Sequence, residues 1–344
     1  MDKNFRKSKK MNKILVLSND KLFFSKGNVF SNYHDTLSLI GTISKKFQIY
    51  LFSRNANVKQ THVIKNNKIK KFFIKDLFRL KKLDLKLFLI SINPLNFFFF
   101  IILSFFLKKI DGYVYIRSDG FKEYFSKYGY FGKYFYYIMY KIISRKLRVI
   151  SVGSNLTHVD TKLILFPSEI TNSWKKKKIN LFNNKKIPKL LYFGRFRREK
   201  GIYSLIEIFR KINSNIQLTL AGDVKMNFDH ENLNYIGRIS NIKKIIKLYD
   251  QHDIFILPSF TEGHPKVILE SLIRGKPVII FPEIKHVIQN FKGIYVSQRN
   301  CMDLKKKVRF IMKNYESINK KILKNKINNK KDFQKDLLKI LLCK

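Results

Sequence analysis

Cysteine and acidic residues are scarce in this 344-residue chain. The two cysteines, Cys301 and Cys343, can form neither a disulfide framework nor a cysteine metal cluster, so we expect a reducing cytoplasm. Only 24 acidic residues oppose 70 Lys and Arg, a formal net charge of +46. Such an excess indicates nucleic acid or an anionic membrane as partner, although abundant Lys, Asn, Ile, Phe and Tyr also fit an AT-rich genome.

A secretory signal is absent from the first ten residues, which are charged and lack an apolar core. We expect residues 1–10 to be a basic extension. Met11 directly precedes the first strand-like run and is an alternative start of translation.

A hydrophobic run from Leu87 to Leu107 contains no charge and could span a bilayer on length alone. Pro94 interrupts it and favours a strand over Leu87–Ser91 followed by a buried helix over Leu95–Leu107. Contact of this run with a membrane is the alternative.

Short apolar runs alternate with longer segments of helical period in both halves of the chain, which predicts two α/β domains with parallel sheets. We expect an N-terminal domain over 11–170, a polar, Lys-rich linker over 171–188, a C-terminal domain over 189–315 and a helical tail over 316–344. The predicted strands are Ile14–Ser18, Gln48–Phe52, Leu87–Ser91, Tyr113–Ile116, Val149–Val152, Leu163–Phe166, Lys189–Phe193, Gln217–Ala221, Asn234–Ile236, Ile254–Leu257, Pro277–Ile280 and Ile294–Val296.

Aromatic residues and lysines interleave between Phe121 and Ile143. A helix of this composition suits a membrane interface, where rings lie at the level of the headgroups and lysines meet lipid phosphates. We favour the alternative, a helix that covers the first sheet.

The segment Thr261–Glu270 carries the most specific chemistry. It follows the apolar run Ile254–Leu257 and leads into helix-forming sequence, with Pro265 suited to the first helical position. The free amides around Gly263 and Val267 would then lie at a helix N-terminus, where a phosphate binds readily. Glu262 and Glu270 could reach opposite ends of one elongated ligand, although Glu pairs at this spacing also arise by chance.

The sequence around this segment resembles the retaining glycosyltransferases of family 4. Ile254–Ile279 is similar to the donor-binding signature of that family nearly throughout, and Leu190–Arg195 with Glu199-Lys200-Gly201 resembles the start of its second domain. Leu220–Asp223 and Tyr235–Ile239 follow in the expected order. The resemblance is specific over about 189–280 and implies the α/β GT-B fold, two Rossmann-like doubly wound domains that face each other across a cleft.

The resemblance also implies roles for single residues. Arg195 and Lys200 would hold the diphosphate of a nucleotide-sugar, Glu262 would face the donor sugar, and Glu270 would accept hydrogen bonds from the ribose. The donor site would further include Gly194, Arg238, Gly263, His264, Pro265, Lys266 and Val267. Two cations beside the leaving phosphate can stabilise it without a metal. The chain contains no D-x-D metal motif, so we expect no metal and no cofactor.

The first domain offers fewer signals. Gly27 and Asn28 follow the first strand, where glycine permits close approach to an anion or sugar. The family often has a histidine after a central strand of this domain, whereas this chain reads Ile116–Gly120, with Asp119 as a candidate substitute.

The sequence therefore predicts a metal-independent, retaining hexosyltransferase-type enzyme that moves a sugar from a nucleoside diphosphate sugar to a glycan or lipid-linked acceptor in polysaccharide or lipopolysaccharide synthesis. It would be cytoplasmic or peripheral on the inner face of an anionic membrane, with no nucleic acid as partner. The alternatives are a basic nucleic-acid-binding protein, for which no recognised module is present, and a catalytically silent membrane scaffold of the same fold. The nucleotide, sugar, acceptor, linkage and oligomeric state are left open by the sequence.

Overall fold

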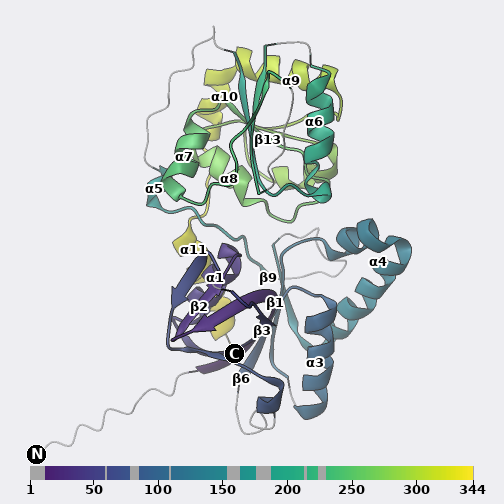
Figure 1. The fold of residues 1–344 in the computed structure, drawn as a ribbon, viewed down its shortest axis with the longest axis vertical. Coiled ribbons are helices and arrows are strands. Elements are labelled where there is room, and N and C mark those ends of the chain that lie inside the picture. The colour runs from purple at the N-terminus through teal and green to yellow at the C-terminus, as the bar shows by residue number, and fades with distance from the viewer. Residues whose placement is uncertain are drawn as a thin grey trace, which may run out of the picture. The chain divides into compact units, whose positions relative to one another are not determined.

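The structure is a computed structural model that describes residues 12–58, 60–77, 85–107, 110–152, 163–175, 187–212, 215–223 and 230–343. The predicted extension 1–10 and Met11 lie outside the described residues, as does most of the predicted linker. The chain divides into two compact units (Figure 1). Unit 1 comprises residues up to Leu165 and from Gln334 onward, and unit 2 comprises Phe166–Phe333.

Unit 1 is built on a mainly parallel sheet in the order β5-β3-β1-β6-β7-β8-β9. Apolar runs form the central strands because both faces of a parallel sheet are covered, and Ile14–Leu17 and Phe88–Ile90 are buried. Helix α1 (His34–Ile43) and the short helix η1 (Ile74–Asp76) belong to this unit. The strands are β1 (Asn12–Ser25), β3 (Phe47–Asn55), β5 (Ile69–Lys71), β6 (Leu85–Ile90), β7 (Gly112–Ile116), β8 (Arg148–Ser151) and β9 (Leu163–Ile164).

Strand β1 runs well beyond the predicted Ile14–Ser18. Its first half pairs in parallel with β3 and β6, and its end forms an antiparallel hairpin with β2 (Asn28–Ser31), which pairs with β4 (His62–Lys65). Lys26 and Gly27 make the turn, both with positive φ. Gly27 follows β1, as predicted, and the hairpin places β2 between it and α1.

The hydrophobic run Leu87–Leu107 forms β6 and helix α3 (Pro94–Phe106), as predicted. Asn93 caps the helix by accepting a hydrogen bond from the Asn96 amide at 3.0 Å, and Pro94 takes the first turn. Phe99, Phe100 and Leu103 lie in the core. Among the described residues no helix is both long and apolar enough to cross a membrane.

Helix α4 (Gly120–Lys146) turns back on itself at Gly129, where φ is 62° and ψ is −152°. The rings of Phe121 and Tyr136 lie only 4.9 Å apart, whereas residues fifteen apart in a straight helix would be separated by about 22 Å. Its inner side, including Tyr140 and Ile143, packs into the core of unit 1. The prediction that this segment covers the first sheet is confirmed for that side.

Unit 2 contains a fully parallel six-stranded sheet in the order β12-β11-β10-β13-β14-β15. Its strands, all predicted within two residues, are β10 (Lys189–Phe193), β11 (Gln217–Ala221), β12 (Leu233–Tyr235), β13 (Ile254–Leu257), β14 (Val278–Ile280) and β15 (Ile294–Val296). Helices cover both faces of this sheet (Figure 1). They are α5 (Asn172–Lys175), η3 (Arg198–Lys200), α6 (Ile202–Arg210), α7 (Ile242–Asp250), α8 (Lys266–Ile273), η4 (Pro282–Ile288), α9 (Cys301–Lys313) and α10 (Tyr315–Ile322).

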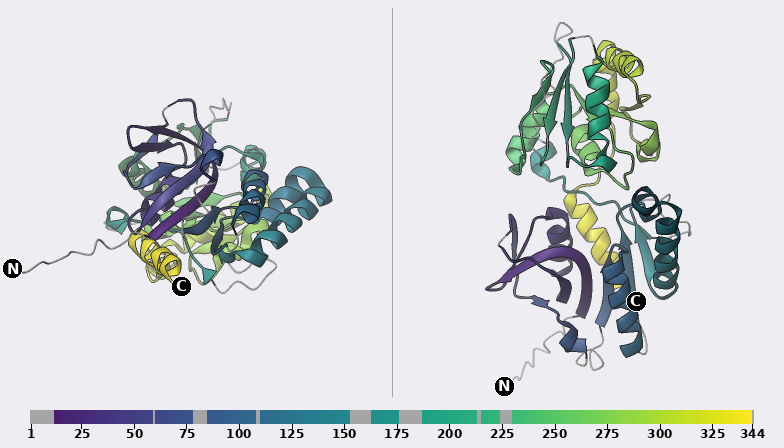
Figure 2. Two further views of the ribbon diagram at one scale, coloured as in Figure 1. Left: turned by 90° about the horizontal axis from the view of Figure 1, so that it is seen from below. Right: turned by 45° about the vertical axis from the view of Figure 1, so that its right-hand side comes forward.

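The boundaries between the units differ from the predicted ones at two places. Unit 2 begins at Phe166, before the predicted linker, because Ile170 and Trp174 are buried in its core. Helix α11 (Lys330–Leu342) lies in the predicted helical tail, and its residues from Gln334 onward belong to unit 1. The Tyr113 hydroxyl donates to the Ile340 carbonyl at 2.7 Å, and Figure 2 shows this yellow helix beside the strands of unit 1.

Candidate functional site in unit 2

The strand order of unit 2 places a topological switch point between β10 and β13, because the chain extends the sheet first on one side and then on the other. Ligands of open α/β sheets bind at the carboxyl ends of the strands at such a point. The loops that follow β10 and β13 carry Gly194–Gly201 and Pro258–Pro265, so the sequence-predicted donor residues meet there.

The loop after β10 is held by main-chain contacts around Arg195. The Tyr192 hydroxyl donates to the Arg195 carbonyl at 2.7 Å, and Asp223 accepts a hydrogen bond from the Phe196 amide at 2.8 Å. Burial, and then the nearby charge of Glu262, raise the pKa of Tyr192. Tyr192 therefore stays protonated and donates its hydroxyl hydrogen. The Arg195 side chain is exposed and can contact a ligand.

Lys200 and Glu262 form an ion pair that joins the two loops. The distance from Lys200 Nζ to Glu262 Oε1 is 2.7 Å, and the buried Ser259 hydroxyl donates to the same oxygen at 2.7 Å. Both side chains are mostly shielded, with 21% and 11% exposed. Sequence analysis placed these residues in one site, and the structure brings their side chains into contact.

Gly201 allows the two loops to approach. Its φ is 65°, and a Cβ atom added there would lie 1.9 Å from the Pro258 carbonyl oxygen. The Phe260 amide also donates to the Glu199 carbonyl at 2.9 Å. Any larger residue at position 201 would push the Pro258 loop away from Lys200.

Helix α8 begins at Lys266 without a side-chain cap. Pro265 is the N-cap residue, with ψ of 110°, rather than the first helical residue as predicted, because its backbone is still extended. The amides that open a helix lack partners within it and carry the positive end of the helix dipole. The arrangement suits a phosphate at this end of the sheet.

His264 lies beside this helix start and packs its ring against Phe166, with centroids 5.0 Å apart. Burial and the charge of Lys266 lower the pKa of His264 to about 4. Its Nε2 atom is buried and has no hydrogen-bond partner in the described part of the chain. The ring is therefore neutral near pH 7.

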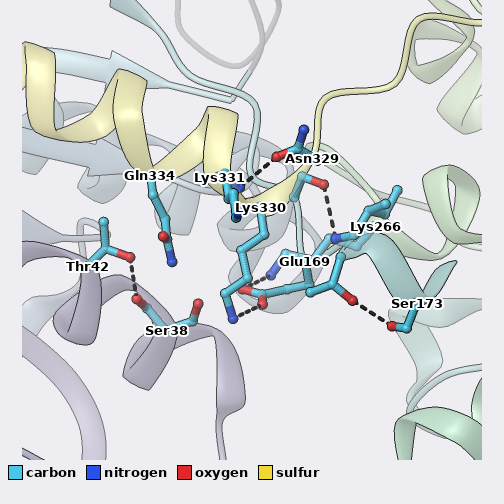
Figure 3. A network of polar contacts seen from close by, with 12 residues as sticks. Ser38, Thr42, Glu169, Ser173, Lys266, Asn329, Lys330, Lys331 and Gln334 are labelled. Atoms are coloured by element: carbon cyan, nitrogen blue, oxygen red, sulfur yellow. Dashed lines mark hydrogen bonds and ion pairs between the residues drawn. The ribbon is translucent and has the colours of Figure 1, made fainter. Parts of the chain in front are cut away.

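The Lys266 side chain contacts the carboxylate of Glu169, with 3.8 Å between Nζ and Oε1 (Figure 3). Glu169 also pairs with Lys330, whose Nζ lies 2.7 Å from Oε2. This carboxylate thus links the start of unit 2 to α8 and to the start of α11.

Glu270 lies in the second turn of α8, apart from the Lys200–Glu262 pair. The Tyr249 hydroxyl of α7 donates to its Oε2 atom at 3.0 Å. Tyr249 is fully buried, and burial followed by the Glu270 charge raises its pKa far above the ordinary value. The tyrosine is thus a fixed donor that orients the carboxylate.

Arg238 follows β12, and its side chain is exposed. The preceding Gly237 has φ of 75°, and its carbonyl accepts a hydrogen bond from the Gly222 amide at 3.1 Å. The loop with Arg238 is thereby tied to the carboxyl end of β11, next to β10.

Arg299 is a supporting residue that sequence analysis missed. Its guanidinium donates to the Pro258 carbonyl at 3.0 Å, pairs with Glu283 at 2.9 and 3.0 Å, and lies 4.2 Å from the Phe260 ring centroid. It therefore holds the loop that presents Glu262. His286 contacts the Glu262 carbonyl at 2.8 Å from the same side of the fold. No local motif identified either residue, since both act on main chain distant in sequence.

The sequence candidates in unit 1 lie on two different elements. Gly27 and Asn28 belong to the hairpin between β1 and β2. Asp119 is buried and caps α4, accepting a hydrogen bond from the Lys122 amide at 3.1 Å. Capping is sufficient to explain an aspartate at this position.

A polar cluster at the switch point of unit 1, between β1 and β6, escaped the sequence analysis. Arg117 donates from Nε to the Ser91 hydroxyl at 3.2 Å and from Nη1 to the Thr36 hydroxyl at 3.3 Å, and Thr36 donates to Asp20. Ser91 has φ of 65°, a conformation that costs energy for a residue with a side chain. The buried Asn96 donates to the Ser91 carbonyl at 3.0 Å and holds this conformation.

Part of the sequence matches a known protein family and curated proteins. Residues 172–331 match the sequence model of the glycosyl transferases group 1. An N,N'-diacetylbacillosaminyl-diphospho-undecaprenol alpha-1,3-N-acetylgalactosaminyltransferase of Campylobacter jejuni is 23% identical over 55% of this chain and 50% of that protein. The capsular polysaccharide biosynthesis glycosyltransferase CapM of Staphylococcus aureus is 28% identical over 52% of this chain and 53% of that protein. The chain spans about half the length of these curated relatives.

Solved structures show the fold of the whole chain. Anabaena HepE in complex with UDP aligns with a TM-score of 0.67 at 13% identity, covering 96% of this chain and 99% of that one. WaaG, a glycosyltransferase involved in lipopolysaccharide biosynthesis, aligns with a TM-score of 0.62 at 10% identity, covering 96% and 99%. With its two Rossmann-like units, the chain has the GT-B fold of glycosyltransferases, as the sequence predicted.

Proposed function

We propose that the protein is a retaining glycosyltransferase of family 4 that moves a sugar from a nucleoside diphosphate sugar to a glycan or lipid-linked acceptor. The donor binds to unit 2, with its diphosphate near Arg195, Lys200 and the start of α8. The relatives named for capsular and diphospho-undecaprenol-linked synthesis support an acceptor of this class.

The single observation that carries the proposal is the contact between Lys200 and Glu262 at the switch point of unit 2. A cation and a carboxylate held by separate loops can contact the phosphate and the sugar on the two sides of a sugar–diphosphate bond. Lys200 stabilises negative charge on the leaving phosphate, and Glu262 accepts hydrogen bonds from the donor sugar.

Glu270 extends the same site toward the nucleoside. Because Tyr249 occupies Oε2 as a donor, the carboxylate is held in one orientation on α8. A carboxylate in this place accepts hydrogen bonds from the two ribose hydroxyls, as the family resemblance implies. Arg238 lies on the loop that would approach the base.

The charge on Arg195 and Lys200 allows transfer without a metal, so we expect activity to survive excess EDTA. Loss of activity in EDTA that added magnesium restores would overturn metal independence.

The retention of configuration is part of the proposal and is tested by the anomeric NMR signal of the first product. The protein would act at the inner face of a membrane that carries its acceptor.

The test of donor binding is a thermal-shift series with UDP-, GDP-, ADP- and CDP-sugars. A ligand that binds only the folded protein stabilises it by about 2.7 kcal/mol when present at 100 times its Kd. The unfolding midpoint rises as a result. We expect one nucleotide class to raise the midpoint in the wild type and to have a much smaller effect on Glu270→Ala. No shift with any donor, or equal shifts in both proteins, would contradict the assignment.

A further inference from the structure

Exposed aromatic side chains are concentrated on two neighbouring helices of unit 1. Helices α3 and α4, 13 and 27 residues long, carry ten of the 25 large apolar side chains that are exposed in the described part of the chain. The two helices pack against each other (Figure 1). An apolar concentration of this kind marks a binding surface rather than scattered surface residues.

The most exposed rings of α4 lie at its bend, where the chain reverses at Gly129. We call Phe125, Tyr128, Tyr130, Phe131 and Tyr134 the α4 tip. Their side chains are between 43% and 80% exposed, with Tyr130 and Phe131 each at 80%. The rings of Phe125 and Tyr130 contact each other across the bend, with centroids 5.0 Å apart.

The bend of α4 is fixed by contacts of its buried residues, not by its exposed rings. Gly132 fits against the Tyr124 carbonyl, where an added Cβ would lie 2.5 Å from the oxygen. Behind it Tyr136 is buried between Phe121 and Tyr124, with ring centroids 4.9 and 5.1 Å away. The inner rings therefore fix the bend, while the rings of the α4 tip contribute little to the core.

The charges around the α4 tip are mostly positive. Lys127 and Lys133 flank it and are exposed, and Lys141 lies over the Tyr137 ring at 5.5 Å. Helix α4 contains a single acidic residue, Glu123, and α3 contains none. A protein partner with an apolar groove would not require this lysine excess, whereas an anionic bilayer meets both features, since rings enter the interface and lysines meet phosphates.

We propose that the α4 tip is a docking surface for anionic lipid bilayers. Tyr130 and Phe131 enter the interfacial region, and Lys127 and Lys133 contact lipid phosphates. On α3, Phe98 and Phe105 are 58% and 85% exposed and extend the apolar area beside it. This inference extends the membrane location within the proposed function, but vesicle binding needs no sugar transfer, so the two can fail separately.

The test is flotation of the full-length protein with vesicles of phosphatidylcholine alone or of phosphatidylcholine mixed equally with phosphatidylglycerol. We expect binding to the mixed vesicles that weakens with added salt. The double variant Tyr130→Ser/Phe131→Ser should bind at least about tenfold more weakly, since each ring that enters the interface removes apolar surface from water. Lys127→Gln/Lys133→Gln should lose roughly fivefold per lysine at low salt.

Two control variants match these changes elsewhere on the surface. Met302→Ser removes a side chain that is 78% exposed in unit 2, and Lys243→Gln/Lys244→Gln removes two exposed lysines of α7. Both controls should bind vesicles as the wild type does, and all variants should keep the wild-type circular dichroism and melting midpoint. Equal binding of the tip variants and the controls would overturn the proposal, as would equal binding to neutral vesicles. So would a self-association, measured by sedimentation, that the tip variants abolish without affecting vesicle binding.

Discussion

The two units of this protein use one sheet architecture, yet they place different chemistry at the same topological point. Unit 2 has at its switch point an ion pair, an exposed arginine and an uncapped helix start. Unit 1 has hydroxyl groups around Arg117 and Asp20, with a strained Ser91. The family model also matches residues 172–331, which lie in unit 2. The comparison teaches that a shared fold positions ligands but that side chains decide which ligand each unit can bind.

The largest expected effect is the loss of Lys200 from unit 2. Lys200→Ala should lower kcat by about 100- to 1,000-fold, the usual cost of removing one group that stabilises transition-state charge. Steady-state transfer with saturating donor measures it. Lys243→Ala removes an exposed lysine of the same unit and should leave kcat unchanged. Wild-type kcat in the Lys200 variant would mean that the ion pair at the switch point of unit 2 has no role in transfer.

The next effect concerns pH. The folded-state pKa of His264, lowered to about 4, lies below its unfolded value near 6.5. The unfolded chain therefore gains a proton first, and the stability contributed by neutral His264 is lost as pH falls from about 6.5 toward 4. At about pH 5 the loss should reach about 2 kcal/mol, and His264→Phe should remove it. Urea unfolding at about pH 5 and pH 7.5 decides; identical pH dependence in both proteins would contradict the neutral ring.

Replacing Arg299 tests whether the loop that carries Glu262 depends on the contact between Arg299 and the Pro258 carbonyl. Arg299→Met should lower the free energy of unfolding by about 1.5–3 kcal/mol, because it removes hydrogen bonds to Glu283 and to the Pro258 carbonyl. We also expect kcat to fall by roughly tenfold at unchanged acceptor KM. Arg309→Met, an exposed arginine of α9, is the control. A stability loss without any change in kcat would restrict Arg299 to folding.

A smaller effect is expected from Tyr249. Tyr249→Phe removes the hydrogen bond to Glu270 and should raise donor KM by about 2- to 10-fold with little change in kcat. Tyr315→Phe also removes one hydrogen bond from a buried tyrosine, to the Asp253 carbonyl, but outside the donor site. Its donor KM should stay at the wild-type value. A rise of the same size in both variants would mean that Tyr249 does not act through Glu270.

The smallest effect concerns Asp119 of unit 1. Asp119→Ala should lower the free energy of unfolding by about 1 kcal/mol, the usual cost of an N-cap. Asp119→Ser should recover most of that stability, because serine caps helices nearly as well. We expect turnover to follow stability in this pair. A stable Ser variant that loses turnover would show a role of Asp119 in transfer. Unit 1 would then contribute a side chain to the reaction as unit 2 does.

Local periodicity was sufficient to predict the parallel strands of both sheets except β5, because most of the others lie in buried apolar runs whereas β5 is short and carries two lysines. The strands β2 and β4 were missed because they are short, half-polar and paired only through the long end of β1. In the site, Lys200, Glu262 and Glu270 were accessible through a contiguous motif. Arg299, Tyr249 and Arg117 were not, because each acts on residues far away in the sequence, and their partners become visible only when strands are ordered in the sheet.

The central claim is that the donor site belongs to the switch point of unit 2. Amide hydrogen exchange of the full-length protein, followed with and without UDP, GDP, ADP and CDP in turn, tests it most directly. We predict that one nucleotide slows exchange at Arg195–Gly201 and Gly263–Glu270, while the amides of Gly27 and Asn28 exchange as before. Protection confined to unit 1, or no protection by any of the four nucleotides, would contradict the account.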